Sequence, residues 1–319
     1  MEGKEDFGRN GDLASALLTS NAYKSLSIEA EVFEVVSKYY PRAFQSPYFT
    51  DIDTGKLREI DVVAWARYCD NRKIKSHCNL YFFIECKSNK GFNIIASGED
   101  LSNKPYVFDC QIWAGQDVNN GFEKSRRVLS RILPAQDHMN KDLLELDKIF
   151  YPRGRRGTIN AEPEIFSNLP FYPSFRETNI KDEKDIDNSV LWRAFQSLLS
   201  AQESKRKKNW EDFENAILEY EVNNRLYKTK LSFEDVIGFS ARNIDKIQKI
   251  IVIDSPLWRR TQANTIESIE YFRLLRQKID DSGVDFVDVI NRQYFSKYME
   301  EVSLHYQKNQ KEKRRRRIF

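Results

Sequence analysis

Hydrophobic and polar residues follow a helical period over residues 27–39. Apolar residues recur there every three or four positions, at Ile28, Val32, Val35, Val36 and Tyr39. This spacing predicts a helix with one apolar stripe, and Pro41 prevents the helix from continuing. Glu31 lies at the edge of the stripe, whereas Glu29 and Glu34 diverge more from it. We therefore expect Glu31 to face whatever the helix covers.

The pattern changes to that of β-strands after residue 56. Residues 57–68 and 80–88 are rich in β-branched and aromatic side chains, and the residues between them are polar. They predict two antiparallel strands joined by a loop. Both alternating sets of positions are apolar in the second strand, which is typical of a strand buried on both faces. Short strands over 92–96 and 106–110 are expected to continue the sheet.

The second half of the chain mixes both patterns. The expected elements are helical structure over 117–149, an irregular proline-rich stretch over 151–187, helices over 188–201 and 210–220 with a charged surface run at 203–209 between them, a buried strand over 249–254, a helix over 264–280, a strand over 284–290 and a last helix that runs into the tail. No linker separates the late strands from the early ones, which form an incomplete sheet alone. We expect a leader segment at 1–26, one domain at 27–307 and a basic tail at 308–319.

Composition indicates a folded, soluble chain. Of its 319 residues, 40% are hydrophobic and 13% aromatic, too many for a disordered protein. No apolar run approaches the roughly 18 residues needed to cross a bilayer, and the first residues do not form a secretory signal. The four cysteines show no CxxC pair, and three histidines leave little material for histidine-centred catalysis. We expect a cytoplasmic protein with no membrane partner, whose chemistry depends on acids and lysines.

The net charge of +3 is distributed unevenly. The tail at 308–319 carries seven basic residues and one acidic residue, so the rest of the chain is close to neutral. Such a tail suits a polyanion, and a solvated chain end explains it equally well. A near-neutral body favours delivery of any nucleic acid with help from a protein partner or a second copy of the chain.

Three charged residues lie on the two early strands. Side chains alternate along a strand, so Glu85 and Lys87 point to one face and Cys86 to the other. Asp61, on the neighbouring strand, lies across from them if the pairing register permits. Two close carboxylates repel each other, and a divalent cation relieves that repulsion. Oxygen ligands of this kind suit Mg²⁺, and Lys87 would then orient the attacking water or stabilise developing charge.

The arrangement D-x(23)-E-x-K on hydrophobic strands resembles the PD-(D/E)xK nuclease superfamily, also called restriction-endonuclease-like. The matching residues are Asp61, Glu85 and Lys87, with the helix residue Glu31 preceding them. The phrase TGKLREIDVVA is itself similar to the segment before the first metal acid in many such nucleases. The resemblance covers residues 27–110, with helical and strand additions at 111–307. It departs from the family at Ile60, where proline would stand.

The resemblance implies an α/β fold with a restriction-endonuclease-like core, a central mixed β-sheet flanked by α-helices, and extra C-terminal helices. It implies that Asp61, Glu85 and the main-chain carbonyl of Cys86 bind catalytic Mg²⁺, for which Mn²⁺ would substitute. Lys87 would assist hydrolysis, and Glu31 would help nearby. The implied protein is a metal-dependent nuclease, with DNA the favoured substrate and restriction or anti-phage defence the implied process.

Other polar residues are further candidates. Glu59 shares a face with Asp61 and would substitute as a ligand, and Gln111 is a candidate accessory residue. Two basic clusters and one Trp-Arg-Arg segment are candidates for contact with nucleic acid, namely Arg153, Arg155 and Arg156; Lys205, Arg206, Lys207 and Lys208; and Trp258, Arg259 and Arg260. A solvated loop explains each basic cluster at least as well, and a core position explains the tryptophan better.

Several alternatives stay open from the sequence. On an exposed strand, Asp61, Glu85 and Lys87 would be a cross-strand salt bridge worth about 0.2–1 kcal/mol. The same fold would also serve a non-cleaving nucleic-acid- or protein-binding module, or a ribonuclease that uses the same site. A helical interaction protein whose basic tail binds an acidic partner is a fourth interpretation. An intact set of two acids and a lysine, on a strand predicted to be buried, favours the catalytic interpretation.

Overall fold

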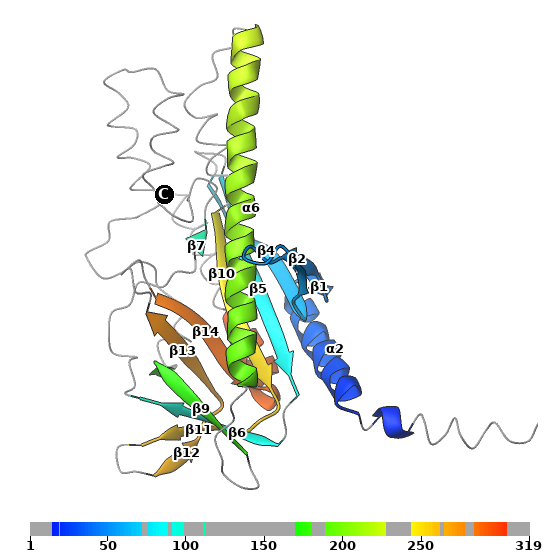
Figure 1. Ribbon diagram of the computed structural model, residues 1–319, viewed down its shortest axis with the longest axis vertical. Helices are drawn as coiled ribbons and strands as arrows, with labels where there is room; N and C mark the ends of the chain where they lie inside the picture. Colours follow the sequence, from blue (N-terminus) through cyan, green and yellow to red (C-terminus); the bar gives the residue numbers. More distant parts are fainter. Residues whose placement is uncertain are drawn as a thin grey trace, which may run out of the picture.

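The structure is a computed structural model, and it shows an α/β protein built on mixed β-sheets (Figure 1). It describes residues 15–18, 20–71, 76–88, 91–98, 111–112, 170–179, 189–227, 244–261, 265–277 and 284–304. The expected strand at 106–110, the helical region at 117–149, the arginine cluster at 153–156 and the tail at 308–319 lie outside these residues.

The main sheet contains strands from both halves of the chain. Its order is β1 (Arg42–Gln45), β4 (Val62–Asn71), β5 (Ser76–Lys87), β10 (Ile244–Ile253), β14 (Val284–Asn291), β13 (Tyr271–Gln277) and β8 (Phe171–Tyr172), with β7 (Gln111–Ile112) pairing β10. Strands β4 and β5 are antiparallel, and β5, β10 and β14 are parallel neighbours. The predicted hairpin, the two predicted late strands and the mixed character of the sheet are confirmed.

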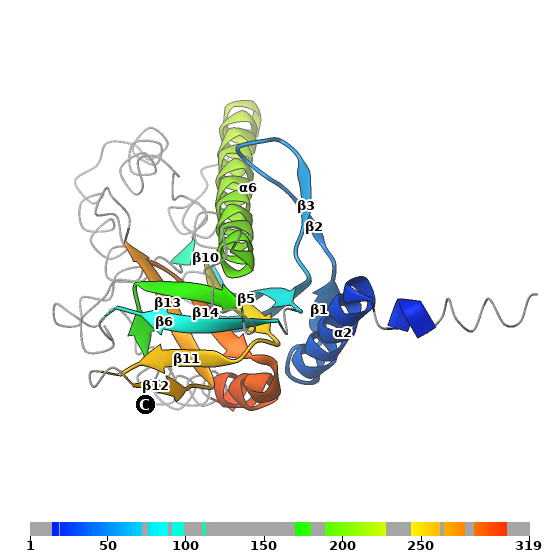
Figure 2. The same ribbon diagram turned by 60° about the horizontal axis from the view of Figure 1, so that its bottom comes forward.

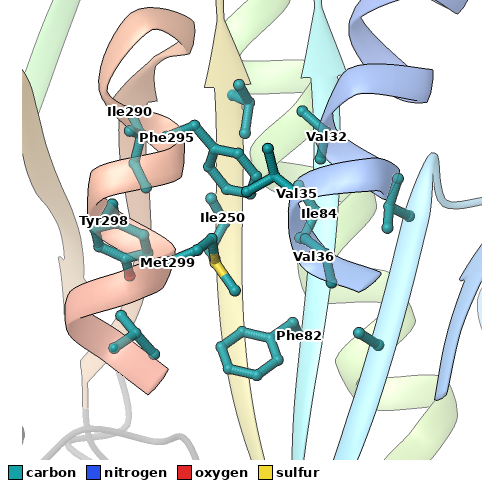
Figure 3. Close-up of a cluster of buried hydrophobic side chains, with 14 of the residues drawn as sticks. Val32, Val35, Val36, Phe82, Ile84, Ile250, Ile290, Phe295, Tyr298 and Met299 are labelled. Carbon is teal, nitrogen blue, oxygen red and sulfur yellow. The ribbon is translucent and has the colours of Figure 1, made fainter. Parts of the chain in front are cut away.

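Helices cover both faces of this sheet. Helix α2 (Asn21–Tyr39) and the helix at residues 295–304, which follows the 3₁₀ turn η1 (Arg292–Tyr294), pack on one face. Figure 3 shows their apolar side chains meeting those of β5 and β10, among them Val36, Phe82 and Met299. Helix α6 (Val190–Tyr227) packs on the opposite face. Strand β5 is therefore buried on both sides, as its sequence predicts.

Helix α2 begins earlier than the apolar stripe indicates. Ser20 caps it, since its side chain accepts a hydrogen bond from the backbone N–H of Tyr23 (3.1 Å). Residues 21–26, which the prediction assigned to the leader, therefore belong to α2. Tyr23 and Leu26 in these first turns are exposed and lie off the apolar stripe, which is why periodicity alone misses them.

Helix α6 is continuous where the sequence predicts two helices and a charged run between them. It contains neither glycine nor proline over its 38 residues, and the lysine, arginine and glutamate of the charged run are good helix formers. The run is also not wholly on the surface. Arg206 is 5% exposed and donates to Glu203 (2.6 Å), and Asn209 is buried.

Two other predictions about the second half are wrong. The expected helix at 264–280 is strand β12 (Ile266–Ser268) followed by β13, and the stretch expected to be irregular contains β8 and β9 (Ser174–Asn179). Strand β13 is buried on both faces, with Phe272 and Leu274 on the side of α6 and Leu275 on the other. A short strand apolar on both faces has the same run of residues as a buried helix, so its periodicity does not distinguish them.

A second sheet lies at one end of the main sheet (Figures 1 and 2). Its order is β12, β11 (Leu257–Arg260), β6 (Phe92–Ser97) and β9. Strand β6 was expected to extend the first hairpin, but it pairs with β11 and β9 instead. Many of the additions expected to be C-terminal helices are therefore strands. Of the expected last helix, residues 295–304 lie within the described part of the chain and are helical. No helix among the described residues is long and apolar enough to cross a membrane.

The face of the sheet beneath the helix at 295–304 contains a fully buried ion pair. The guanidinium of Arg273 on β13 donates to both carboxylate oxygens of Asp288 on β14, at 2.6 and 3.0 Å. Tyr298 and Gln248 also donate to Asp288. The hydrogen-bonding groups of the pair are satisfied, so burying the intact pair costs little folding free energy. Removal of one member would leave the other charge buried without a partner, which is strongly destabilising.

We predict that Asp288→Ala lowers the free energy of unfolding by about 3–5 kcal/mol, because Arg273 would be left buried without its carboxylate. Urea unfolding followed by circular dichroism measures this loss. The matched control is Lys297→Ala, which breaks an exposed pair with Glu270 (3.2 Å) and should cost at most about 1 kcal/mol. Equal losses in the two variants would contradict the structural role of the buried pair.

Candidate active site

Asp61, Glu85 and Lys87 come together where β4 begins and β5 ends. The register pairs Val62 with Ile84, so Asp61, one residue before β4, lies beside the last residues of β5. The ammonium of Lys87 is 2.5 Å from Oε2 of Glu85 and 3.4 Å from Oδ2 of Asp61. The ammonium of Lys87 therefore lies between the carboxylates of Asp61 and Glu85, as the sequence pattern predicts for a permissive register.

Backbone contacts hold Asp61 in this place. Its carboxylate oxygen Oδ2 accepts a hydrogen bond from the backbone N–H of Cys86 (2.6 Å), and its main-chain carbonyl accepts one from Ser46 (2.9 Å). Ser46 has a positive φ of 52° in the turn after β1, a conformation that non-glycine residues adopt rarely. Asp61 interrupts the long strand predicted over 57–68, which divides into β3 (Leu57–Glu59) and β4.

Glu85 is the most deeply buried member of the set, with 4% of its surface exposed. Alternation along β5 points it toward α6, and Ser197 on that helix donates a hydrogen bond to its Oε1 (2.8 Å). The carboxylate thus has Ser197 on one oxygen and Lys87 on the other. Beside it is a cavity of about 300 Å³, lined by Glu85, Lys87, Val190, Arg193 and Ala194. The acid and the lysine are therefore open to a ligand from the side of α6.

Burial and charge shift the titration of this pair. Burial raises the pKa of Glu85, and the neighbouring Asp61 carboxylate adds to this, while Lys87 opposes it. Burial disfavours the ammonium form of Lys87, but the carboxylates of Glu85 and Asp61 outweigh it, so its pKa lies above the ordinary value. Lys87 is therefore a cation at neutral pH. It can orient a water or stabilise negative charge, and it is not suited to remove a proton.

Cys86 is not a nucleophile in this site. Its thiol packs in the core on the α2 side of the sheet, and burial raises its pKa well above the usual range. The residue acts through its backbone, whose N–H donates a hydrogen bond to Oδ2 of Asp61.

The acid that α2 brings to the site is Glu29, and the expectation for Glu31 is wrong in this respect. Glu31 has 47% of its side chain exposed and pairs with Arg292. Glu29 is 8% exposed and accepts a hydrogen bond from Ser25 (3.0 Å). Burial raises the pKa of Glu29, and the carboxylate of Asp61 raises it further. At 100° per residue, both glutamates lie about 80° from the middle of the apolar stripe, on opposite sides. The larger divergence expected for Glu29 is therefore wrong, and the sequence does not decide between the two.

The other predicted residues are placed as follows. Glu59 is exposed on β3. Gln111 lies in β7, of which only the backbone is described. Arg153, Arg155 and Arg156 lie outside the described residues. Arg206 is buried against Glu203, so its expected contact with a phosphate is contradicted, whereas Lys205, Lys207 and Lys208 line a separate cavity. Trp258 donates to Asn93, and Arg259 pairs with Glu267.

Sequence reasoning missed three residues of the site. Glu29, Arg193 and Ser197 reach it from helices that pack on opposite faces of β5. Ser197 and Arg193 are four residues apart, which puts them on one side of α6. That spacing is visible in the sequence, but nothing in the sequence indicates that this side of the helix meets Glu85.

The donor set fits a hard divalent cation. In the described ranges, no group of three or more His, Cys, Asp or Glu side chains is placed to hold a metal. The candidate ligands are two carboxylates, and the Lys87 ammonium between them shows that a positive charge is accommodated there. Two carboxylates leave most positions of an octahedral ion to water and substrate, which is the usual coordination of Mg²⁺.

Comparison with protein-family models, with curated proteins and with solved structures finds no match to this chain.

We predict that Lys87→Met raises the pKa of Glu85 further, because it removes the charge that opposes the effect of burial. Carboxyl-labelled glutamate followed by NMR across a pH series measures this shift, and Glu85→Gln assigns the resonance. Lys38→Met, on an exposed turn of α2, should leave it unchanged. An unchanged or lowered pKa in Lys87→Met would refute the contact between Lys87 and Glu85.

Proposed function

We propose that this protein is a Mg²⁺-dependent nuclease of the PD-(D/E)xK type that hydrolyses phosphodiester bonds in nucleic acid. The observation that supports it most is the convergence of Asp61, Glu85 and Lys87 at the ends of adjacent strands, with Lys87 between the two carboxylates. A buried carboxylate and an ammonium that open onto a cavity are typical of a functional site, since burial of charge without purpose is costly.

The order of elements around the site supports the finer fold assignment. Helix α2 precedes the antiparallel pair β4 and β5, and α6 then leads to β10, which lies parallel to β5. This is a mixed sheet with the acid-bearing strands beside each other and a helix on each face. We propose that it corresponds to a restriction-endonuclease-like core, to which the second sheet is an addition.

Each residue has a chemical role in this proposal. Asp61, Glu85 and the main-chain carbonyl of Cys86 would hold Mg²⁺, and Mn²⁺ would substitute for it. When bound, the ion would lower the pKa of a water and neutralise charge on the phosphate. Lys87 would orient the attacking water and stabilise the negative charge that develops on the phosphate oxygens. Ser197 fixes the Glu85 carboxylate, and Glu29 adds negative charge near Asp61.

The resemblance to the superfamily favours DNA as the substrate and restriction or anti-phage defence as the process. The catalytic residues themselves treat DNA and RNA alike, because their chemistry is directed at the phosphate. The assay therefore includes both polymers, and a non-cleaving binding module is one of its outcomes.

We predict that the wild-type protein cleaves nucleic acid in Mg²⁺ or Mn²⁺ and that EDTA abolishes the activity. Asp61→Asn, Glu85→Gln and Lys87→Ala should each lower kcat/KM by about 100-fold or more, as the removal of one preorganised catalytic group commonly does. Plasmid nicking, with parallel assays on single-stranded DNA and RNA, measures the rates. Titration of Mn²⁺ by electron paramagnetic resonance should show weaker binding in Asp61→Asn.

Lys38→Ala is the matched control for Lys87→Ala, because Lys38 is an exposed lysine on α2 that pairs with Glu34 on the same helix. Absence of cleavage by the wild type on every polymer would reject the nuclease. Full activity of Lys87→Ala would reject the assigned site.

We also predict that the two glutamates of α2 differ in effect. Glu29→Gln should lower kcat/KM about tenfold, a loss typical of residues that support a metal ligand, because it removes a buried charge whose field acts on Asp61. Glu31→Gln should leave the rate unchanged and cost at most about 1 kcal/mol of stability through its exposed contact with Arg292. Rate assays and urea unfolding measure both. The reverse order of activities would show that Glu31 is the functional helix acid.

A further inference from the structure

A second, larger cavity lies on the same side of β5 as the candidate active site. It has a volume of about 670 Å³, and its lining comes from α6, from β5 and from the hairpin of β2 (Tyr48–Thr50) and β3. Figure 2 shows this hairpin and α6. Its base includes Tyr81 and Phe83, the residues that precede Glu85 and Lys87 on the same face of β5. We name it the lysine–tyrosine cavity, after Lys205, Lys207, Lys208, Tyr48 and Tyr81 in its lining. Its volume is typical of a ligand site.

The hairpin is held in place by hydrogen bonds within its turn and to α6. The carboxylate of Asp51 accepts hydrogen bonds from the backbone N–H groups of Asp53 and Thr54 (3.0 Å each), and Gly55 supplies the positive φ of 67° that the turn needs. Ser204 on α6 donates to the main-chain carbonyl of Thr50, which ties the hairpin to the helix. The cavity is therefore formed before any ligand enters it, which lowers the entropic cost of binding.

The charges that line the cavity favour an anion. Its three lysines come from two adjacent turns of α6. The lining contains two acids, and both have a cationic neighbour: Asp51 pairs with Arg58, and Glu211 lies 4.0 Å from Lys207. The ammonium of Lys205 lies 4.7 Å from the centre of the Tyr81 ring, which directs it into the cavity.

The apolar part of the lining favours an aromatic group. Tyr48 is 70% exposed at the rim, although a side chain of its size is usually more buried. Phe49, Tyr81 and Phe83 contribute further ring surface. An aromatic surface beside lysines is the combination that binds a nucleotide, with the base on the rings and the phosphate on the ammonium groups.

The cavity and the active site lie along the same helix. Ser197 contacts Glu85, and Ser204 follows two turns later on the same side of α6. Lys205, which lines the larger cavity, is about 18 Å from Arg193 along the helix axis. Arg193 lines the active-site cavity, and its guanidinium forms no hydrogen bond or ion pair with the part of the chain that the structure describes. Cationic side chains thus line both cavities, at a separation along α6 that several extended nucleotides would span.

We propose that the lysine–tyrosine cavity binds an unpaired nucleotide of single-stranded nucleic acid, and that the same strand continues along α6 to Arg193 and the active site. The base must be unpaired because it has to leave its partner to enter a hollow between a hairpin and a helix. The binding site stands on its own observations, and the continuation to the active site rests on the proposed nuclease function.

The test measures binding without cleavage. In EDTA, a fluorescein-labelled oligothymidylate of about 12 nucleotides should bind the wild type, and the matching duplex should bind at least about tenfold more weakly. Tyr48→Ala should weaken binding of the single strand about fivefold or more, the lower end for loss of a stacked ring. Lys205→Ala combined with Lys208→Ala should lower the slope of log affinity against log salt by about 1.4, the value for two phosphate contacts.

Lys38→Ala combined with Lys297→Ala is the matched control, since it removes two exposed lysines outside the cavity lining and should leave the slope unchanged. Circular dichroism confirms that each variant is folded, and Tyr48 is exposed enough for its replacement to be tolerated. Equal affinity for duplex and single strand, or unchanged binding in both cavity variants, would overturn the proposal. So would competition by thymidine monophosphate at the affinity of the oligomer, which would assign the cavity to a free nucleotide.

Failure of this inference and failure of the proposed function are distinguishable. If the wild type cleaves nucleic acid while the cavity variants bind the single strand normally, only the cavity assignment fails. If the single strand binds as expected but no polymer is cleaved in Mg²⁺ or Mn²⁺, the cavity assignment holds and the nuclease is rejected.

Discussion

The arrangement of the site depends on one lysine between two carboxylates at the ends of paired strands. The carboxylates of Asp61 and Glu85 would repel each other if nothing lay between them. The ammonium of Lys87 relieves this repulsion, because it lies 2.5 Å from Glu85 and 3.4 Å from Asp61. The antiparallel register of β4 and β5 determines which residues meet. If β5 were shifted by one residue, Glu85 would point toward α2, into the apolar core on that face. The backbone N–H of Cys86 then holds Asp61, so the strand pairing itself orients the acid.

The same sheet contains a second set of buried charges with a different purpose. Arg273 and Asp288 are fully enclosed, and their hydrogen bonds are satisfied within the protein by a bidentate contact and by Tyr298. Glu85 and Lys87 are paired as well, but they line a cavity. A closed pair contributes to a unique packing, whereas an open pair can exchange its internal partner for a ligand. This difference in access, more than burial alone, separates a structural pair from a candidate catalytic one.

Helix α6 connects the features on which the proposals depend. It covers one face of the sheet through Leu191, Phe195 and Leu198, and it places Ser197 against Glu85. Its next turns form one wall of the lysine–tyrosine cavity. Because the helix is unbroken through its charged run, the two cavities are held at a fixed separation. A substrate strand that follows the helix would therefore meet two preformed cavities at a set spacing.

The sequence by itself determined the elements whose pattern is local: the stripe of α2, the β4–β5 hairpin, strands β10 and β14, and the set of Asp61, Glu85 and Lys87. Only the tertiary structure decided which flank of α2 faces Asp61, so Glu29 replaces Glu31, and it alone assigned β6 to a second sheet and made residues 266–277 strands. The physical reason is that the periodicity of apolar residues indicates which positions are buried. It does not indicate which element buries them, because that depends on contacts between residues far apart in the chain.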